Sequence, residues 1–151
     1  MNLFWIIYVA LITLLPWIEC RGSIPIAISL GMPWYVYFFI FLANLAIFPI
    51  VWFVMDYFWD TFLSRIKFLK RMVERIRKRG KKYLEKYGYL GLTFFVAIPL
   101  PFTGVYSGTV LAWLFNLSRK KSFVFISIGT LIAMIIVGII SGGIKLILWN
   151  L

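Results

Sequence analysis

Two charged side chains, Glu19 and Arg21, stand between apolar runs near the start of the chain. Ionisable residues in such a setting are costly in a bilayer, and they therefore suggest function. Because burial favours the neutral form of a carboxyl group, Glu19 could take up and release a proton near neutral pH. Arg21 could hold an anion through its forked guanidinium, or pair with Glu19 until a substrate displaces it. An interfacial ion pair in a connecting loop is the alternative, and it would follow if Leu3–Ile18 formed a full span.

A second stretch, residues 98–108, carries no charge but offers hydroxyl and backbone groups. A helix beginning near Gly104 would direct unpaired N–H groups towards an anion such as phosphate or carboxylate. Gly104 and Gly108 also have the spacing that lets two helices pack closely, and both roles can hold together. The predicted binding residues are Glu19, Arg21, Gly22, Ser23, Pro25, Pro99, Pro101, Thr103, Gly104, Ser107 and Gly108.

Polar residues of the first long apolar segment are secondary candidates. Asp56 and Asp60 lie one helical turn apart and could serve a proton pathway, but such residues more often mark a helix end at the interface. Asn44 lies mid-segment and could donate a hydrogen bond to another helix or line a polar path.

The residues that are missing exclude most enzyme chemistry. The chain has no His, a single Cys and five acidic residues. Zinc sites of Cys and His, Ser-His-Asp triads and all-oxygen metal cages are therefore not expected. No glycine-rich phosphate loop is present. We expect no enzyme, no metal and no cofactor.

Composition indicates an integral membrane protein. Of 151 residues, 63% are hydrophobic and 14% are charged, whereas soluble domains average about 25% charged. The formal charge is +11, and residues 64–88 hold 11 basic and two acidic residues. Such a block between apolar runs needs no nucleic acid to explain it.

The charges also constrain topology, because short basic loops stay in the cytoplasm. The basic block and the cluster Arg119–Lys121 should lie on the same side of the membrane. A re-entrant hairpin over residues 88–118, broken by Pro and Gly, satisfies this condition, whereas a single crossing does not. Broken backbone at membrane depth needs cover by protein or a water-filled cavity.

The two halves of the chain share one plan, and the predicted fold is therefore all-α and membrane-embedded. Each half has a broken, re-entrant segment (1–31, 88–118) followed by a transmembrane helix (32–56, 119–151), and the halves are inverted relative to each other. The breaks are marked by Pro16, Gly22 and Pro25 in the first half and by Pro99, Pro101 and Gly104 in the second. Paired interruptions of this kind point to a transporter-type binding site. The alternatives are that Pro and Gly are simply common in membrane helices, and that residues 1–31 span the membrane.

A basic amphipathic helix, residues 57–87, joins the halves. Apolar residues recur every three or four positions, and Gly80 should end or bend the helix. We expect it to lie at the cytoplasmic interface and to bind anionic headgroups; a lid or a guide for lipid phosphates is the sharper alternative. The apolar positions are Phe62, Ile66, Leu69, Val73 and Ile76.

The motifs resemble those of the small multidrug export proteins of prokaryotes, distant relatives of the DedA/VTT superfamily. Glu19, Arg21, Gly22, Ser23, Ile24 and Pro25 match the pattern E-x-R-G-[AS]-I-P, and Pro99, Pro101, Thr103 and Gly104 match P-x-P-x-T-G. Phe102 stands where a small residue is usual, and the second hairpin lacks ionisable residues until Arg119. The resemblance covers essentially the whole chain. It implies two re-entrant hairpins that meet near the membrane centre, and transport with lipid-linked phosphates as the superfamily's cargo.

We therefore expect a multi-pass transporter of the cell membrane, with the segment 57–87 and Arg119–Lys121 in the cytoplasm. It would move an amphipathic or anionic substrate, with a lipid-linked phosphate as one candidate and Glu19 as the candidate for proton coupling. A homodimer is expected because half-depth segments need protein cover. The alternative function is a structural or assembly protein that binds lipid without transport.

Overall fold

The computed structural model describes residues 3–61, 67–100 and 103–149, and within these ranges the chain is helical without strands. The predicted all-α class is therefore confirmed for the described residues. The helices are α1 (Leu3–Thr13), α2 (Glu19–Ser29), α3 (Tyr35–Thr61), α4 (Lys67–Ala97), α5 (Val105–Leu114) and α6 (Arg119–Trp149).

Two of the helices, α3 and α6, are long and apolar enough to cross a membrane. Over their apolar windows only 33% and 28% of the residues are buried inside the molecule. The core helix of a soluble protein is mostly buried, so these helices instead present apolar surface outwards, as membrane helices do. The apolar residues of α3 and α6 are therefore suited to contact with lipid more than to an internal protein core.

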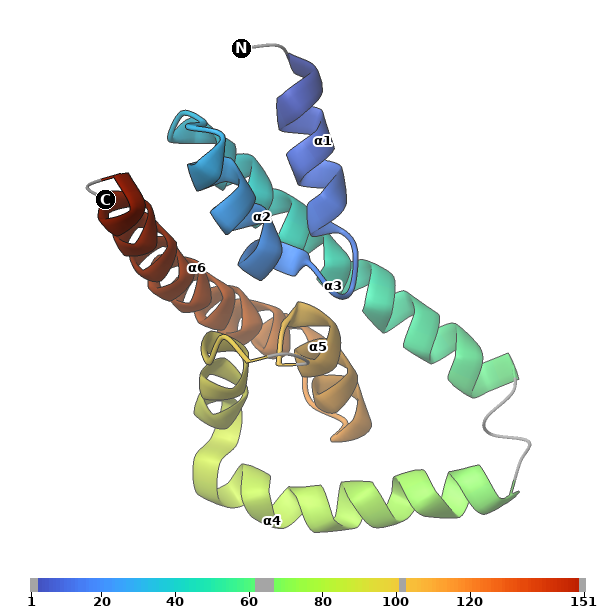
Figure 1. Cartoon of the computed structure of the whole chain (residues 1–151). Coiled ribbons are helices and arrows are strands. Elements are labelled where there is room, and N and C mark those ends of the chain that lie inside the picture. Colours follow the sequence, from blue (N-terminus) through green and yellow to red (C-terminus); the bar gives the residue numbers. More distant parts are fainter. Residues whose placement is uncertain (1–2, 62–66, 101–102, 150–151) are drawn as a thin grey trace.

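Two short helical hairpins flank the long helices. In the first, α1 and α2 have 11 residues each, which is about 16 Å and half of a bilayer's hydrocarbon thickness. In the second, the apolar end of α4 (Tyr87–Ala97) turns back into α5, which has 10 residues. Figure 1 shows the turn at residues 14–18 close to the end of α4 and the start of α5, in the middle of the molecule.

The hairpins are interlocked with the long helices rather than lying beside them. The second helix of each hairpin packs on the long helix of the other half, α2 on α6 and α5 on α3. One buried apolar cluster surrounds α2 and another surrounds α5. The first contains Val9, Ile24, Ala27, Ile40 and Val137, and the second contains Ile47, Trp52, Val96, Ala112 and Ile126.

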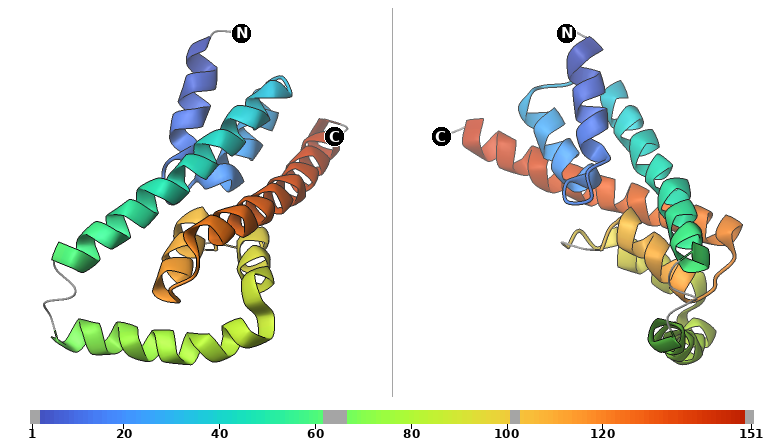
Figure 2. Two further views of the ribbon diagram at one scale, coloured as in Figure 1. Left: turned by 180° about the vertical axis from the view of Figure 1, so that it is seen from behind. Right: turned by 90° about the vertical axis from the view of Figure 1, so that its right-hand side faces the viewer.

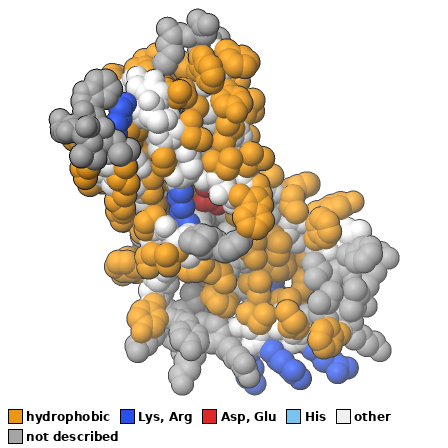
Figure 3. All heavy atoms as spheres, viewed as in Figure 1, with side chains coloured by type: hydrophobic (Ala, Val, Ile, Leu, Met, Phe, Trp, Pro, Cys, Tyr) orange, Lys and Arg blue, Asp and Glu red, His pale blue; other side chains and the backbone are white. Residues whose placement is uncertain are grey.

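The two ends of the molecule differ in charge. The start of α1, the loop before α3 and the end of α6 lie at one end, and α4 crosses the other (Figures 1 and 2). On α4 the side chains of Lys70, Arg71, Arg75 and Lys78 are exposed, whereas Val73 is buried. In the space-filling view, blue side chains line this lower edge beneath a largely apolar face (Figure 3). The predicted amphipathic character is present, although Phe62 and Ile66 lie outside the described residues.

Two sequence expectations about helix breaks were wrong. The helix α4 runs through Gly80 without interruption and bends at Gly88, whose φ of 53° lies in the left-handed region that glycine adopts freely. Gly22 and Pro25 do not break the first segment but lie inside α2, because neighbouring packing tolerates a proline in such helices. Of the three marked positions, only Pro16 lies in the first turn.

One arginine fastens α4 to the rest of the molecule. The Arg77 guanidinium lies 5.2 Å from the ring centroids of both Trp59 on α3 and Trp113 on α5. Its Nε–H donates a hydrogen bond of 3.2 Å to the Leu114 carbonyl at the end of α5. The amphipathic helix is thereby tied to both the long helix of the first half and the second hairpin.

Candidate functional site

Glu19 links the two motifs at the start of α5. Its carboxylate oxygens accept hydrogen bonds of 3.3 Å from the backbone N–H groups of Val105 and Tyr106. Glu19 is only 5% exposed, and its φ of 45° is unusual for a residue other than glycine. Because α5 has no side-chain cap from its own N-cap residue, Glu19 supplies the anion that a helix N-terminus favours.

Gly104 makes this approach possible. A Cβ atom built at Gly104 would lie 1.7 Å from Oε2 of Glu19, which no real structure tolerates. The residue is fully packed under the carboxylate and must remain without a side chain. The predicted role of Gly104 at a helix start thus gains a specific atomic reason.

Arg21, two residues after Glu19 in α2, reaches the end of α4. Its guanidinium donates to the carbonyl oxygens of Val96 at 3.3 Å, Ile98 at 3.0 Å and Leu100. The last carbonyls of a helix have no partner inside the helix and carry partial negative charge. Arg21 therefore binds one carbonyl in the last turn of α4, that of Val96, and two in the turn that follows, while Glu19 caps the start of α5.

Tyr106 makes the reverse connection from the second hairpin to the first. Its hydroxyl donates to the Leu14 carbonyl, at the end of α1. Each hairpin thus sends a donor from its second helix to the end of the other hairpin's first helix, Arg21 in one direction and Tyr106 in the other.

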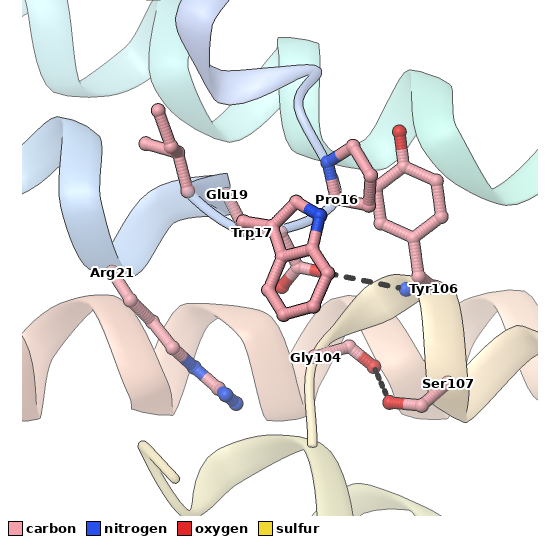
Figure 4. A pocket seen from close by; sticks show the side chains of 8 residues that line it. Pro16, Trp17, Glu19, Arg21, Gly104, Tyr106 and Ser107 are labelled. Atoms are coloured by element: carbon pink, nitrogen blue, oxygen red, sulfur yellow. Dashed lines mark hydrogen bonds between the residues drawn. The ribbon is translucent and has the colours of Figure 1, made fainter. Parts of the chain in front are cut away.

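A pocket of about 420 Å³ opens where these connections meet. In the space-filling view, side chains of both charges lie there in a hollow surrounded by apolar surface (Figure 3). Figure 4 shows Trp17 and Pro16 over the Glu19 carboxylate, with Arg21 turned away from it towards the chain below. The pocket is lined by Pro16, Trp17, Ile18, Glu19, Arg21, Gly104, Tyr106 and Ser107.

Four of the eleven predicted binding residues line this pocket, namely Glu19, Arg21, Gly104 and Ser107. Six of the others do not line the pocket, and Pro101 is outside the described residues. Ser23 is buried, donates to the Glu19 carbonyl at 2.9 Å and accepts from the Thr13 hydroxyl at 2.7 Å.

The remaining predicted residues serve packing and the second turn. The Thr103 hydroxyl contacts the carbonyls of Ile98 and Leu100 at 2.6 and 2.8 Å. A Cβ at Gly108 would lie 2.6 Å from the Val96 side chain, which fits the packing role of that glycine. Gly22, Pro25 and Pro99 do not line the pocket either.

The secondary candidates lie away from the pocket. Asp56 accepts a 2.6 Å hydrogen bond from the indole N–H of Trp113, which joins α3 to α5. Asn44 is completely buried within α3. The side chain of Asp60 is outside the described set. Within the described ranges, no group of three or more His, Cys, Asp or Glu side chains could hold a metal.

Four pocket residues were not predicted from the sequence: Pro16, Trp17, Ile18 and Tyr106. Three of them directly precede Glu19, and Tyr106 lies two positions after Gly104. Their closeness to the motifs was a usable signal. The resemblance to a known family implied that the hairpins would meet, but no pattern in the sequence indicated which residues would line the pocket between them.

Comparison with known proteins places the chain in a family. No curated protein and no solved structure matches it. A family model described as "Putative small multi-drug export protein" matches residues 19–136, from the glutamate of the pocket to the middle of α6. That range includes all of the second hairpin and most of both long helices, and on this ground the chain belongs to that family of small membrane export proteins.

Proposed function

We propose that the chain is a secondary transporter that carries an amphipathic or anionic substrate through the pocket between its two hairpins. The observation that carries this proposal is the meeting of two half-length hairpins at a pocket that contains both Glu19 and Arg21. The family's description as an export protein supports transport rather than catalysis. A lipid-linked phosphate is the substrate class we favour, in analogy to the DedA relatives.

The proposed topology places the hairpins as re-entrant segments that enter from opposite faces. The first would enter from the end that holds the start of α1, and the second from the end crossed by α4 (Figure 2). The positive-inside rule then puts α4 and Arg119–Lys121 in the cytoplasm. The reciprocal packing of α2 on α6 and α5 on α3 supports two inverted halves.

The proposed mechanism is a competition between the Glu19 carboxylate and the substrate anion for the N-terminus of α5. The Glu19 carboxylate accepts the two N–H groups that an anionic substrate would use. Protonation of Glu19 removes its negative charge and weakens this hold, which opens the helix N-terminus to the substrate. Uptake of a proton by Glu19 and binding of the anion would then be coupled, whereas release of the proton would expel the anion.

Two further expectations accompany this function. The exposed cations of α4 would bind anionic headgroups and hold the helix at the interface. Two copies would associate so that the irregular turn at residues 14–18 is covered by protein.

Flux into proteoliposomes tests the transport mechanism, with a fluorescent prenyl phosphate as one probe and ethidium as the other. We expect Glu19→Gln to abolish the pH dependence of flux, because an amide cannot titrate. Glu74→Gln, on the exposed face of α4, is the matched control and should behave as wild type. Flux through Glu19→Gln with unchanged pH dependence would exclude proton coupling at Glu19, and no flux of either probe by wild type would favour the structural alternative.

Accessibility of engineered cysteines tests the topology, in a background with Cys20→Ser. Ser29 and Ser118 are both exposed. Ser29 ends α2 and Ser118 directly precedes α6, and these two helix termini lie at opposite ends of the molecule (Figure 1). An impermeant thiol reagent added to intact cells should label Ser29→Cys and should spare Ser118→Cys until the membrane is opened. Labelling of Ser118→Cys from outside would overturn the re-entrant arrangement.

A further inference from the structure

A second cavity, separate from the pocket at Glu19, lies between α2, α3 and α6. It measures about 480 Å³ and is lined by apolar side chains together with Tyr37. Two of its α6 residues, Leu131 and Ile135, are 47% and 54% exposed. None of its lining residues belongs to the pocket between the hairpins.

The cavity continues along one face of α6 towards a cation. Leu131, Ile135, Gly138, Gly142 and Lys145 follow each other at steps of three or four, so they share a face of the helix. A Cβ at Gly138 or Gly142 would meet nothing within 4 Å. The surface of α6 is therefore open from the cavity to Lys145. We call the cavity and this open face of α6 together the groove.

Lys145 is fixed at the end of this groove. Its Nζ donates a 2.6 Å hydrogen bond to the carbonyl of Ile28, which itself lines the cavity. An ammonium group has three N–H donors, and this bond uses one of them. The groove therefore ends in a positive charge that is held in place by backbone.

The position of Lys145 corresponds to a membrane interface. It lies 26 residues after Arg119 on the same helix, about 39 Å away, which exceeds the hydrocarbon thickness of a bilayer. The same end of the molecule carries Trp34, which is 81% exposed, and Tyr35. Such aromatic residues mark the headgroup level, so the groove itself lies at the depth of the acyl chains.

We propose that this groove binds one anionic phospholipid, with an acyl chain in the cavity and the phosphate at Lys145. The proposal rests on the membrane placement given under the proposed function, but not on transport. An acyl chain gains little by leaving the bilayer for a groove of similar polarity. Selection must therefore come from the headgroup, and Lys145 gives the site its preference for negative charge.

A second copy of the chain fits this site less well than a lipid. All five acidic side chains are at positions 19, 56, 60, 74 and 85. Glu19 is buried in the pocket between the hairpins. The other four positions belong to the end of α3 and to α4, towards the opposite end of the molecule (Figure 1). In a copy with the same membrane orientation, none of these positions on the described helices lies at the level of Lys145.

The test uses phosphatidylglycerol and phosphatidylcholine that carry a photoreactive group on the acyl chain, each reconstituted in turn with the full chain. We expect phosphatidylglycerol to label residues between Leu131 and Gly138 and between Ile24 and Ile28. Lys145→Gln should reduce this labelling about fivefold, towards the level of phosphatidylcholine. Lys121→Gln, at the other end of α6, is the matched control and should leave groove labelling unchanged.

A second pair of variants tests the shape of the groove. Gly138→Leu should fill the open space and remove the labelling, whereas Gly143→Leu, on another face of α6, should retain it. Equal labelling by both lipids, or labelling that survives Gly138→Leu, would overturn the proposal. Crosslinks between two copies at Leu131 or Ile135 would show instead that protein covers the groove. Lipid labelling does not require transport. The lipid site can therefore be disproved while the transport function stands, and transport can be disproved while the lipid site stands.

Discussion

At the scale of single residues, Glu19 does for α5 what a local N-cap residue usually does. It reaches that helix from a position 86 residues earlier in the chain. The consequence is that a local feature of one hairpin depends on the presence of the other. Gly104 is the residue on which this contact depends most, because its missing side chain leaves the space that the carboxylate fills.

Gly104→Ala should destabilise the protein by about 1–3 kcal/mol, because the added methyl group forces the carboxylate away. Unfolding in detergent, followed by circular dichroism, measures the loss. Gly143→Ala adds the same methyl where nothing lies within 4 Å, and it should be neutral or stabilising. Equal effects of the two substitutions would contradict the contact between Glu19 and Gly104.

Asp56 provides a second residue-scale prediction. Asp56→Leu leaves the buried Trp113 indole N–H without its acceptor and should cost about 1–3 kcal/mol of stability. Asp56→Asn retains a carbonyl oxygen and should cost less. Chemical denaturation measures the stability of both Asp56 variants, and a flux assay in proteoliposomes measures their transport. Normal stability with lost flux in Asp56→Asn would indicate a proton pathway rather than a structural bond.

At the scale of helices, the exposed ends of the short segments are satisfied by cations from elsewhere in the chain. Arg21 binds the end of α4, Arg77 the end of α5 and Lys145 the end of α2. Carbonyls at helix ends have no water to bind inside a bilayer. The pairing of each helix end with a positive side chain also matches the direction of the helix dipole.

Arg21→Lys should therefore be damaging although it preserves the charge. A lysine ammonium cannot match the planar fork that reaches three carbonyls, and the loss should be about 1.5–3 kcal/mol. Arg75→Lys on the exposed face of α4 is the control and should be silent. Thermal unfolding measures the stability of both variants. An Arg21→Lys variant as stable as wild type would contradict the role of Arg21 in binding these carbonyls.

Most of the elements could be predicted from the sequence, but not all of their boundaries. The long apolar segments predict α3 and α6, and the basic amphipathic pattern predicts the first part of α4. Glycine often ends helices, which favours a bend at Gly80, yet within α4 the non-helical backbone is at Gly88. For Gly22 and Pro25 the local propensity to break a helix was overridden by packing within the first hairpin.

The site was predictable in its residues more than in its contacts. Glu19 and Arg21 were notable because charges are rare among apolar runs. Their partners are backbone groups, the N–H of Val105 and Tyr106 and the carbonyls near residue 98. Every residue has such groups, so no side-chain pattern identifies which of them will be used.

At the scale of the whole molecule, two apolar clusters are built around the two hairpins and joined through the long helices. The turn at residues 14–18 presents Leu15 at 50% exposure. Irregular backbone at membrane depth requires cover, and this turn is the surface that we assign to a dimer contact.

A crosslinking experiment checks this assignment. In the Cys20→Ser background, Leu15→Cys should form a disulfide-linked dimer in membranes when an oxidant is added. Ile139→Cys, which is 71% exposed on the regular helix α6, should remain monomeric. Crosslinking of Ile139→Cys alone would move the contact to another face, and crosslinking of neither variant would argue against a dimer.

The long sequence separation between Glu19 and its partners has a consequence for biogenesis. When the first hairpin leaves the ribosome, the residues that Glu19 and Arg21 will bind have not yet been synthesised. Until Val96 and Tyr106 follow, both charges must be kept near water or near the insertion machinery, because lipid offers them no partner. A nascent chain stopped before α5 should therefore be recognised and degraded as an unassembled membrane protein, and completion of the second hairpin is the step that makes the first one stable.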